Sequence, residues 1–197
     1  MDSLIPDRIR ALADSLKGRL DLLLICLSRG WGGLEEVTLN DAIRLTEQGI
    51  GVRFLCFEES PIHERLLQNP LLVTEPIRFQ PRLYFDFRLR AELPRLIGAG
   101  VNLIHCVQPQ WLGSISPWLW GKSKTALLIS RHKFNFSRER NPIPTLLYRR
   151  VDALIVYSRA LRRNILQTQS VREGQIKVIH FGLNFQHLDP TRVSMDR

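Results

Sequence analysis

The sequence lacks the features that mark several large protein classes. Its three cysteines, Cys26, Cys56 and Cys106, lie in separate apolar segments and form no Cys-x-x-Cys pair. That spacing argues against a disulfide framework, a redox pair or a metal site, and it is typical of buried, reduced thiols. No apolar run approaches the roughly 20 residues that span a bilayer, and the first residues are too charged for a secretory signal. We therefore expect a cytoplasmic protein without a metal centre.

Three catalytic signatures are absent as well. The chain has no Gly-x-Ser-x-Gly nucleophile turn, no Gly-x-x-x-x-Gly-Lys-Ser/Thr phosphate loop and no His-Glu-x-x-His zinc motif. Its carboxylates are scattered and offer no recognisable pair in contrasting surroundings. Hydrolase and nucleoside-triphosphatase chemistry therefore have no residues to support them.

What the chain does contain begins with a strand, a glycine turn and a helix start. The apolar run 22–27 predicts a buried strand, and apolar residues at helical spacing after Gly32 and Gly33 predict a helix that Gly49 ends. Adjacent glycines let backbone amides approach a diphosphate, and the helix N-terminus adds its positive dipole end. The turn is therefore a candidate phosphate loop, with glycines used only for packing as the alternative. Glu35 either orients this loop or favours the helix N-terminus.

Short apolar segments alternate with helical patterns along the rest of the chain. We expect helices over 86–97, where Pro94 should kink or interrupt the pattern, and over 113–121, and one capped by Ser158. Residues 1–20 form an amphipathic helical extension that is either packed or a surface anchor. The alternation predicts an α/β fold, a Rossmann-like parallel sheet with helices on both faces. Its further strands are expected at 51–57, 71–77, 102–107, 125–130, 152–157 and 176–181.

The positive charge is concentrated in one third of the chain. The formal net charge is +9, and the segment from Arg131 to Arg172 holds ten basic residues and two acidic ones. Such a segment favours anions, whether membrane headgroups, a phosphorylated acceptor or nucleic acid. A solvated helix face is the alternative, above all for Arg162 and Arg163. Nucleic acid is the weaker interpretation because no aromatic platform or known motif accompanies the arginines.

Several segments, taken in order, resemble the N-terminal domain of GT-B glycosyltransferases of the retaining, nucleotide-sugar-dependent type (glycosyltransferase family 4-like). The resemblance covers most of residues 21–190. It is carried by WGGLEEVTLNDAIRLTEQGIGVRFLCFEESP, NLIHCVQP, SRH at 130–132, RRVDALIVYSRALRRNIL and IKVIHFGLNFQHLDP. It implies that residues 21–185 are an acceptor-side domain and 186–197 the start of an interdomain linker. The chain would be one half of a GT-B fold, inactive without a C-terminal donor domain.

The resemblance also implies roles for individual residues. Gly32, Gly33 and Glu35 would form the donor-diphosphate loop, and His132 would be the catalytic residue beside the transferred sugar. Residues implied to bind the acceptor or an anion are His105, Arg131, Lys133, Arg138 and Arg140.

The partners implied are a nucleotide-sugar donor, which is a substrate rather than a cofactor, and a carbohydrate or lipid-linked acceptor. We expect no nucleic acid, and the basic segment favours peripheral contact with the anionic inner face of the cytoplasmic membrane. The alternative is a non-enzymatic Rossmann-like module that binds an anionic partner or complements a separate donor-domain chain.

Overall fold

A parallel sheet organises the structure, a computed structural model that describes residues 14–82, 86–98, 100–121, 124–134 and 142–182. Within these residues seven strands pair in the order β3-β2-β1-β4-β5-β6-β7, and every neighbouring pair is parallel. The strands are β1 (Asp21–Ile25), β2 (Gly51–Phe57), β3 (Val73–Ile77), β4 (Leu103–Cys106), β5 (Ala126–Arg131), β6 (Ala153–Val156) and β7 (Ile176–Val178). The predicted α/β class is confirmed.

The central strands are apolar on both faces because helices cover both faces of the sheet. Each residue from Leu22 to Leu27 is at most 3% exposed, as expected for a parallel strand buried on both sides. The strand is held in register by pairs such as Leu22↔Val52 and Leu22↔Leu103. The three cysteines lie at this centre, free and fully buried, as their apolar surroundings predicted.

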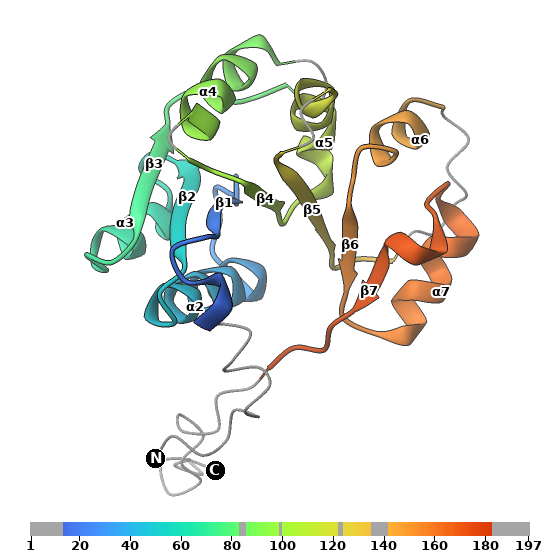
Figure 1. Cartoon of the computed structure of the whole chain (residues 1–197), viewed down its shortest axis with the longest axis horizontal. Helices are drawn as coiled ribbons and strands as arrows, with labels where there is room; N and C mark the ends of the chain where they lie inside the picture. The colour runs from blue at the N-terminus through green and yellow to red at the C-terminus, as the bar shows by residue number, and fades with distance from the viewer. Residues whose placement is uncertain (1–13, 83–85, 99, 122–123, 135–141, 183–197) are drawn as a thin grey trace, which may run out of the picture.

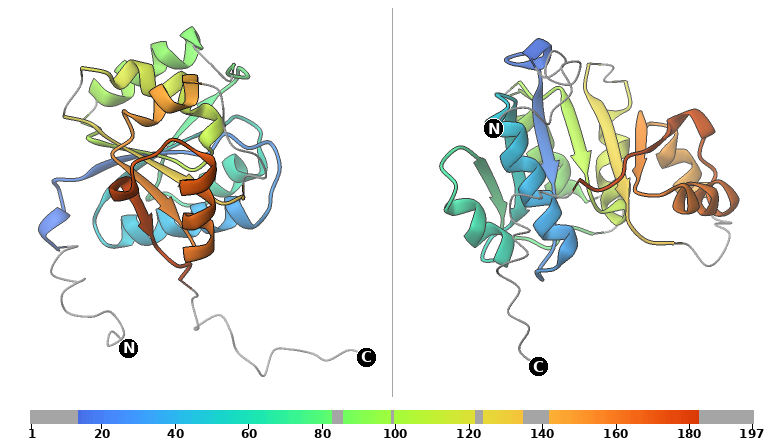
Figure 2. Two further views of the ribbon diagram at one scale, coloured as in Figure 1. Left: turned by 90° about the vertical axis from the view of Figure 1, so that its right-hand side faces the viewer. Right: turned by 90° about the horizontal axis from the view of Figure 1, so that it is seen from below.

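The helices divide the core in two. Helices α2 and α3 pack on one face, whereas α4, α5 and α6 pack on the other (Figure 1). Leu161 and Ile165 of α7 join the second core, and Figure 2 shows the helical layers from two further sides. The bounds are α2 (Gly33–Glu47), α3 (Pro61–Leu67), α4 (Phe87–Gly98), α5 (Leu112–Ile115), α6 (Pro142–Tyr148) and α7 (Arg159–Thr168), with 3₁₀ turns at Pro109–Trp111, Ser116–Leu119 and Glu173–Gln175.

Two local signals in the sequence act as expected. Gly49 follows the end of α2 with φ of +80°, a left-handed conformation that favours glycine. Ser158 caps α7, because its hydroxyl accepts a hydrogen bond from the backbone N–H of Leu161 at 3.0 Å.

Two expectations differ from the structure. Helix α4 runs through Pro94 without the interruption that was the second of two expected outcomes; the carbonyl that loses its donor belongs to Arg90, an exposed residue, so water can satisfy it. Residues 113–121 do not form one helix: a short α5 ends at Ile115, and a 3₁₀ turn containing Pro117 follows.

Of the predicted 1–20 extension, residues 14–20 are described, and backbone N–H groups of Arg19 and Leu20 close a helical turn by donating to the carbonyl oxygen of Leu16. The predicted linker 186–197 lies outside the described residues.

Candidate active site

The candidate site lies where the direction of the strand order reverses. β1 and β4 are neighbours, but the chain continues from β1 toward one edge of the sheet and from β4 toward the other. In open parallel sheets, the loops that follow two such strands diverge and leave a crevice at their carboxyl ends. The glycine turn follows β1 at this edge, and Gln108, His132 and Tyr157 follow β4, β5 and β6.

The glycine turn leaves open space in front of helix α2. Gly32 is the N-cap residue with φ of −169°, and Gly33 is the first helical residue. A Cβ added to Gly33 would meet no described atom within 4 Å, and one added to Gly32 would be in ordinary contact, 3.4 Å from Oε2 of Glu35. Neither a left-handed backbone nor close packing therefore requires these glycines. No side chain of the described residues caps α2, so its first N–H groups face this space.

His132 lies beside the turn, just beyond β5. Its ring packs against Tyr157, with centroids 4.7 Å apart, and Tyr157 stacks on Phe181 at 3.8 Å. Burial lowers the pKa of His132 to about 4, and the nearby Glu35 carboxylate opposes this shift without reversing it. The imidazole is therefore neutral at pH 7. Its Nε2 is buried and has no hydrogen-bond partner among the described residues, a costly arrangement unless a ligand supplies one.

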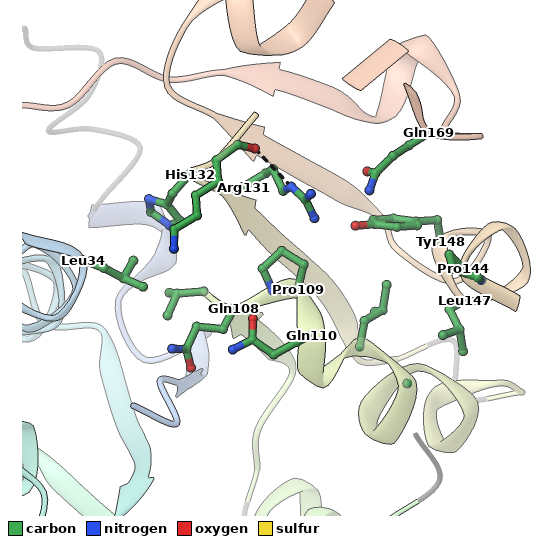
Figure 3. A pocket seen from close by; sticks show the side chains of 14 residues that line it. Leu34, Gln108, Pro109, Gln110, Arg131, His132, Pro144, Leu147, Tyr148 and Gln169 are labelled. Carbon is green, nitrogen blue, oxygen red and sulfur yellow. Dashed lines mark hydrogen bonds between the residues drawn. The ribbon is translucent and has the colours of Figure 1, made fainter. Parts of the chain in front are cut away.

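A cavity of about 380 Å³ opens next to His132 (Figure 3). Apolar side chains of Leu34, Val107 and Leu112 contribute to its wall. Polar groups come from the ends of several elements, and Figure 3 shows the Arg131 and Tyr148 side chains pointing into the space between β5 and α6. The polar lining residues are Gln108, Gln110, Arg131, His132, Lys133, Tyr148 and Gln169. An apolar cavity with a few convergent polar groups is typical of a small-molecule site.

Comparison with known proteins identifies the family to which the sequence belongs. The sequence model of Glycosyltransferase Family 4 matches residues 31–187. The chain belongs to glycosyltransferase family 4. No curated protein matches its sequence significantly.

Solved structures share the fold of this family 4 chain. HepE of Anabaena, solved in complex with UDP and glucose, is 18% identical with a TM-score of 0.67 over 85% of this chain and 46% of its own. A glycosyltransferase of Rickettsia africae is 15% identical with a TM-score of 0.71 over 90% and 47%. The lipopolysaccharide outer core galactosyltransferase WaaB, in its apo form, is 10% identical with a TM-score of 0.58 over 83% and 46%. The chain thus spans about half the length of these structures, which are GT-B glycosyltransferases.

The structure brings some predicted site residues of the family 4 chain together and separates others. Arg131, His132 and Lys133 line one cavity. His105 does not line it: its Nε2 lies 2.7 Å from Oγ of Ser130, which also accepts a hydrogen bond from the Tyr157 hydroxyl at 3.3 Å. That network connects β4, β5 and the end of β6, and its Tyr157 ring also packs against His132. Burial lowers the pKa of His105 to about 4, and His132 adds to the shift. Arg138 and Arg140 lie outside the described residues.

The basic segment is not one continuous anion-binding surface. Arg150 donates to the carbonyl oxygens of Leu119 and Thr125 and pairs with Asp152 at 2.8 Å, so it joins α6 to the sheet. Arg162 pairs with Glu173. Exposed basic residues of the segment are Lys133, Arg149, Arg159, Arg163 and Arg172.

Sequence reasoning missed four polar residues of the cavity, Gln108, Gln110, Tyr148 and Gln169. Tyr148 ends α6, Gln169 follows α7, and Gln108 follows β4. The position of Gln108 directly after a predicted strand is a signal that could have identified it. Tyr148 and Gln169 carry no such signal, because only the packing of α6 and α7 brings them here. No cluster that could hold a metal ion, and no helix long and apolar enough to cross a membrane, occurs in the part of the chain that the structure describes.

Proposed function

We propose that this chain is the acceptor-side half of an enzyme that transfers a sugar from a nucleotide-sugar donor to a carbohydrate or lipid-linked acceptor. The observation that carries the proposal is the neutral His132, which lines the cavity and whose buried Nε2 has no hydrogen-bond partner among the described residues. Family membership supports the reaction class. HepE, whose structure holds UDP and glucose, supports the kind of donor. In this proposal the chain requires no cofactor, because the nucleotide sugar is a substrate.

The residues divide the chemistry between them. Amides of Gly32 and Gly33 and the N-terminus of α2 stabilise negative charge on the departing diphosphate. Nε2 of His132 hydrogen-bonds a hydroxyl of the transferred sugar and orients the donor toward the acceptor. Glu35 is 7% exposed in the first turn of α2 and holds the loop beside His132. The acceptor occupies the cavity, where Arg131 and Lys133 line the wall.

The domain organisation is part of the same proposal. Residues 21–185 form the acceptor-side domain, residues 1–20 a helical extension and residues 186–197 the start of a linker to a donor-binding domain. The exposed Arg149, Arg159 and Arg163 would draw this cytoplasmic domain to the anionic inner face of the membrane, where lipid-linked acceptors are presented.

A transfer assay tests the proposal. The 197-residue chain, alone and joined to the donor-binding half of a family 4 enzyme, is supplied with nucleotide sugars and saccharide or lipid-linked acceptors. We expect no glycoside from the chain alone and both nucleoside diphosphate and glycoside from the joined protein. Turnover by the chain alone would refute the need for a donor domain. No donor-dependent product from a folded joined protein would favour the non-enzymatic module.

His132→Ala in the joined protein tests the mechanism. We expect kcat to fall by about 10² to 10⁴ with a smaller change in KM, because the lost contact acts mainly in the transition state. His132→Gln, which keeps a polar group at this position, should lose less. Thermal unfolding of both variants is the control for folding. Turnover near that of the unmodified protein, with unchanged stability, would leave His132 without a role in the reaction.

A further inference from the structure

The polar groups that line the cavity beside His132 are all positive or neutral. Arg131 and Lys133 are its charged residues, and three glutamine amides and a tyrosine hydroxyl supply other polar atoms. Its described lining contains no carboxylate. A cleft that presents charge of one sign between low-dielectric walls concentrates ligands of the opposite charge. The lining therefore selects for an anionic ligand.

Tyr148 and Arg131 form an interacting polar pair in the wall of the cavity. Tyr148 is 5% exposed, and burial raises the pKa of its hydroxyl, although hydrogen bonds with Gln169 and Arg131 oppose the shift. The hydroxyl therefore stays protonated and can donate. Nε of Arg131 donates to the carbonyl oxygen of Lys133 at 3.3 Å, which turns the end of the guanidinium toward Tyr148 (Figure 3). Such a planar group suits the oxygens of a phosphate or carboxylate.

Hydrogen bonds fix the backbone that carries Tyr148. Nε2 of Gln175 donates to the carbonyl oxygen of Tyr148 at 3.2 Å, and the Ser116 hydroxyl donates to the carbonyl oxygen of Leu147 at 2.8 Å. These bonds tie the last turn of α6 to two neighbouring segments. The geometry of the tyrosine hydroxyl is therefore set before a ligand arrives.

Gln169 contributes a buried hydrogen-bond acceptor next to this pair. Its side chain contacts the Tyr148 hydroxyl, but its buried Oε1 has no hydrogen-bond partner among the described residues. A buried acceptor without a donor is costly. A ligand with a hydroxyl group next to its anionic group would supply the donor, and saccharides carry hydroxyls next to most of their substituents.

We propose that the acceptor is a saccharide with an anionic substituent, a phosphate ester or a carboxylate, bound by Arg131 and Tyr148 while Oε1 of Gln169 accepts from a neighbouring hydroxyl. The inference deepens the proposed function, since it names the acceptor class of the same site. It depends on binding alone, so the chain can be tested without a donor or a second domain.

Titration of the 197-residue chain by calorimetry, at one fixed ionic strength, tests the inference. The ligands are glucose, glucose 6-phosphate, glucuronate and inorganic phosphate. We expect at least one anionic sugar to bind about tenfold or more tightly than glucose, as a charge-assisted hydrogen bond predicts. The tighter of the two anionic sugars distinguishes phosphate from carboxylate. Equal affinity for glucose and both anionic sugars would overturn the proposal, and so would inorganic phosphate binding as tightly as the sugar phosphate.

Three variants locate the binding. Tyr148→Phe removes one hydroxyl and should weaken binding of the anionic sugar about tenfold. Gln169→Glu keeps the shape but adds a negative charge, so it should abolish this binding while leaving the fold intact. Lys177→Gln, which removes an exposed positive charge of β7 outside the cavity, is the matched control and should have no effect. Full affinity in both cavity variants would overturn the assignment. A failed titration would leave the sugar-transfer proposal standing, because that proposal also admits neutral acceptors.

Discussion

Two neighbouring histidines are buried in their neutral form at the carboxyl edge of the sheet. The pKa of His105 and that of His132 are both lowered to about 4, in each case chiefly by burial. Ordinary histidine titrates near 6.5. The unfolded chain therefore binds protons at these positions over a pH range in which the folded chain does not.

The free energy of unfolding should consequently decrease as the pH is lowered below about 6.5. A group whose pKa is depressed by folding stabilises the fold above its unfolded pKa and loses this contribution as pH falls toward its folded pKa. Between pH 6 and 5, His105 should account for a loss of about 1 kcal/mol, and His132 for less, because water screens its more exposed ring. Urea unfolding at both pH values measures the difference. His105→Gln should remove the larger part of it and His132→Gln a smaller part, and a double variant with the full loss would contradict the assignment.

At the level of single residues, the sequence predicts best where chemistry is local. Gly32, Gly33 and His132 each follow a predicted strand, and parallel strands bring their carboxyl ends to one edge of the sheet. Tyr148 could not be found in this way, because its position depends on how α6 packs. His105 also follows the strand pattern, but the alternation of side chains along β4 turns it toward Ser130 and not into the cavity.

At the level of elements, three aromatic rings connect the ends of β5, β6 and β7. His132, Tyr157 and Phe181 follow these strands in turn, and the stacked Tyr157 and Phe181 rings are nearly parallel, with 6° between their planes. Phe181 is 48% exposed, yet its ring centroid is 6.2 Å from that of His132. The segment after β7 therefore forms part of the cover over the proposed catalytic histidine.

Phe181→Ala should raise the pKa of His132 from about 4 toward 6.5, because burial is the main cause of the shift. Titration of the histidine ring protons by NMR measures this change in the intact chain. Phe87→Ala is the matched control, since Phe87 is also exposed but lies at the start of α4, outside the stack. An unmoved His132 titration in Phe181→Ala would show that Tyr157 alone shields the ring.

At the level of the whole molecule, the fold was more predictable than the site. The run 22–27 is apolar throughout, and only a sheet covered on both faces buries such a run completely. The order of the strands then follows from short right-handed connections. The proposed site instead combines the ends of β1, β4, β5, α6 and α7, which are widely separated in sequence. Which of those ends converge is decided by three-dimensional packing.

The three buried cysteines allow the opening of the sheet to be measured by the reactivity of their thiols. Cys26, Cys56 and Cys106 lie at the ends of β1, β2 and β4, and burial raises the pKa of the Cys56 and Cys106 thiols to about 12. Only the exposed thiolate reacts with an aromatic disulfide reagent. In native buffer we expect all three thiols to react at one common rate, about a thousandfold or more slower than in urea, since the unfolded fraction of an ordinary domain is about 10⁻³ or less.

An early reaction of Cys56 alone would show that the β2–β3 edge opens before the rest, and mass spectrometry of the labelled peptides would identify it. Simultaneous labelling means that the strands on both sides of the reversal point separate in one event. The crevice that would hold the diphosphate exists only while these strands stay paired, so the slowing of thiol labelling relative to urea also measures the fraction of molecules in which the proposed binding surface is open.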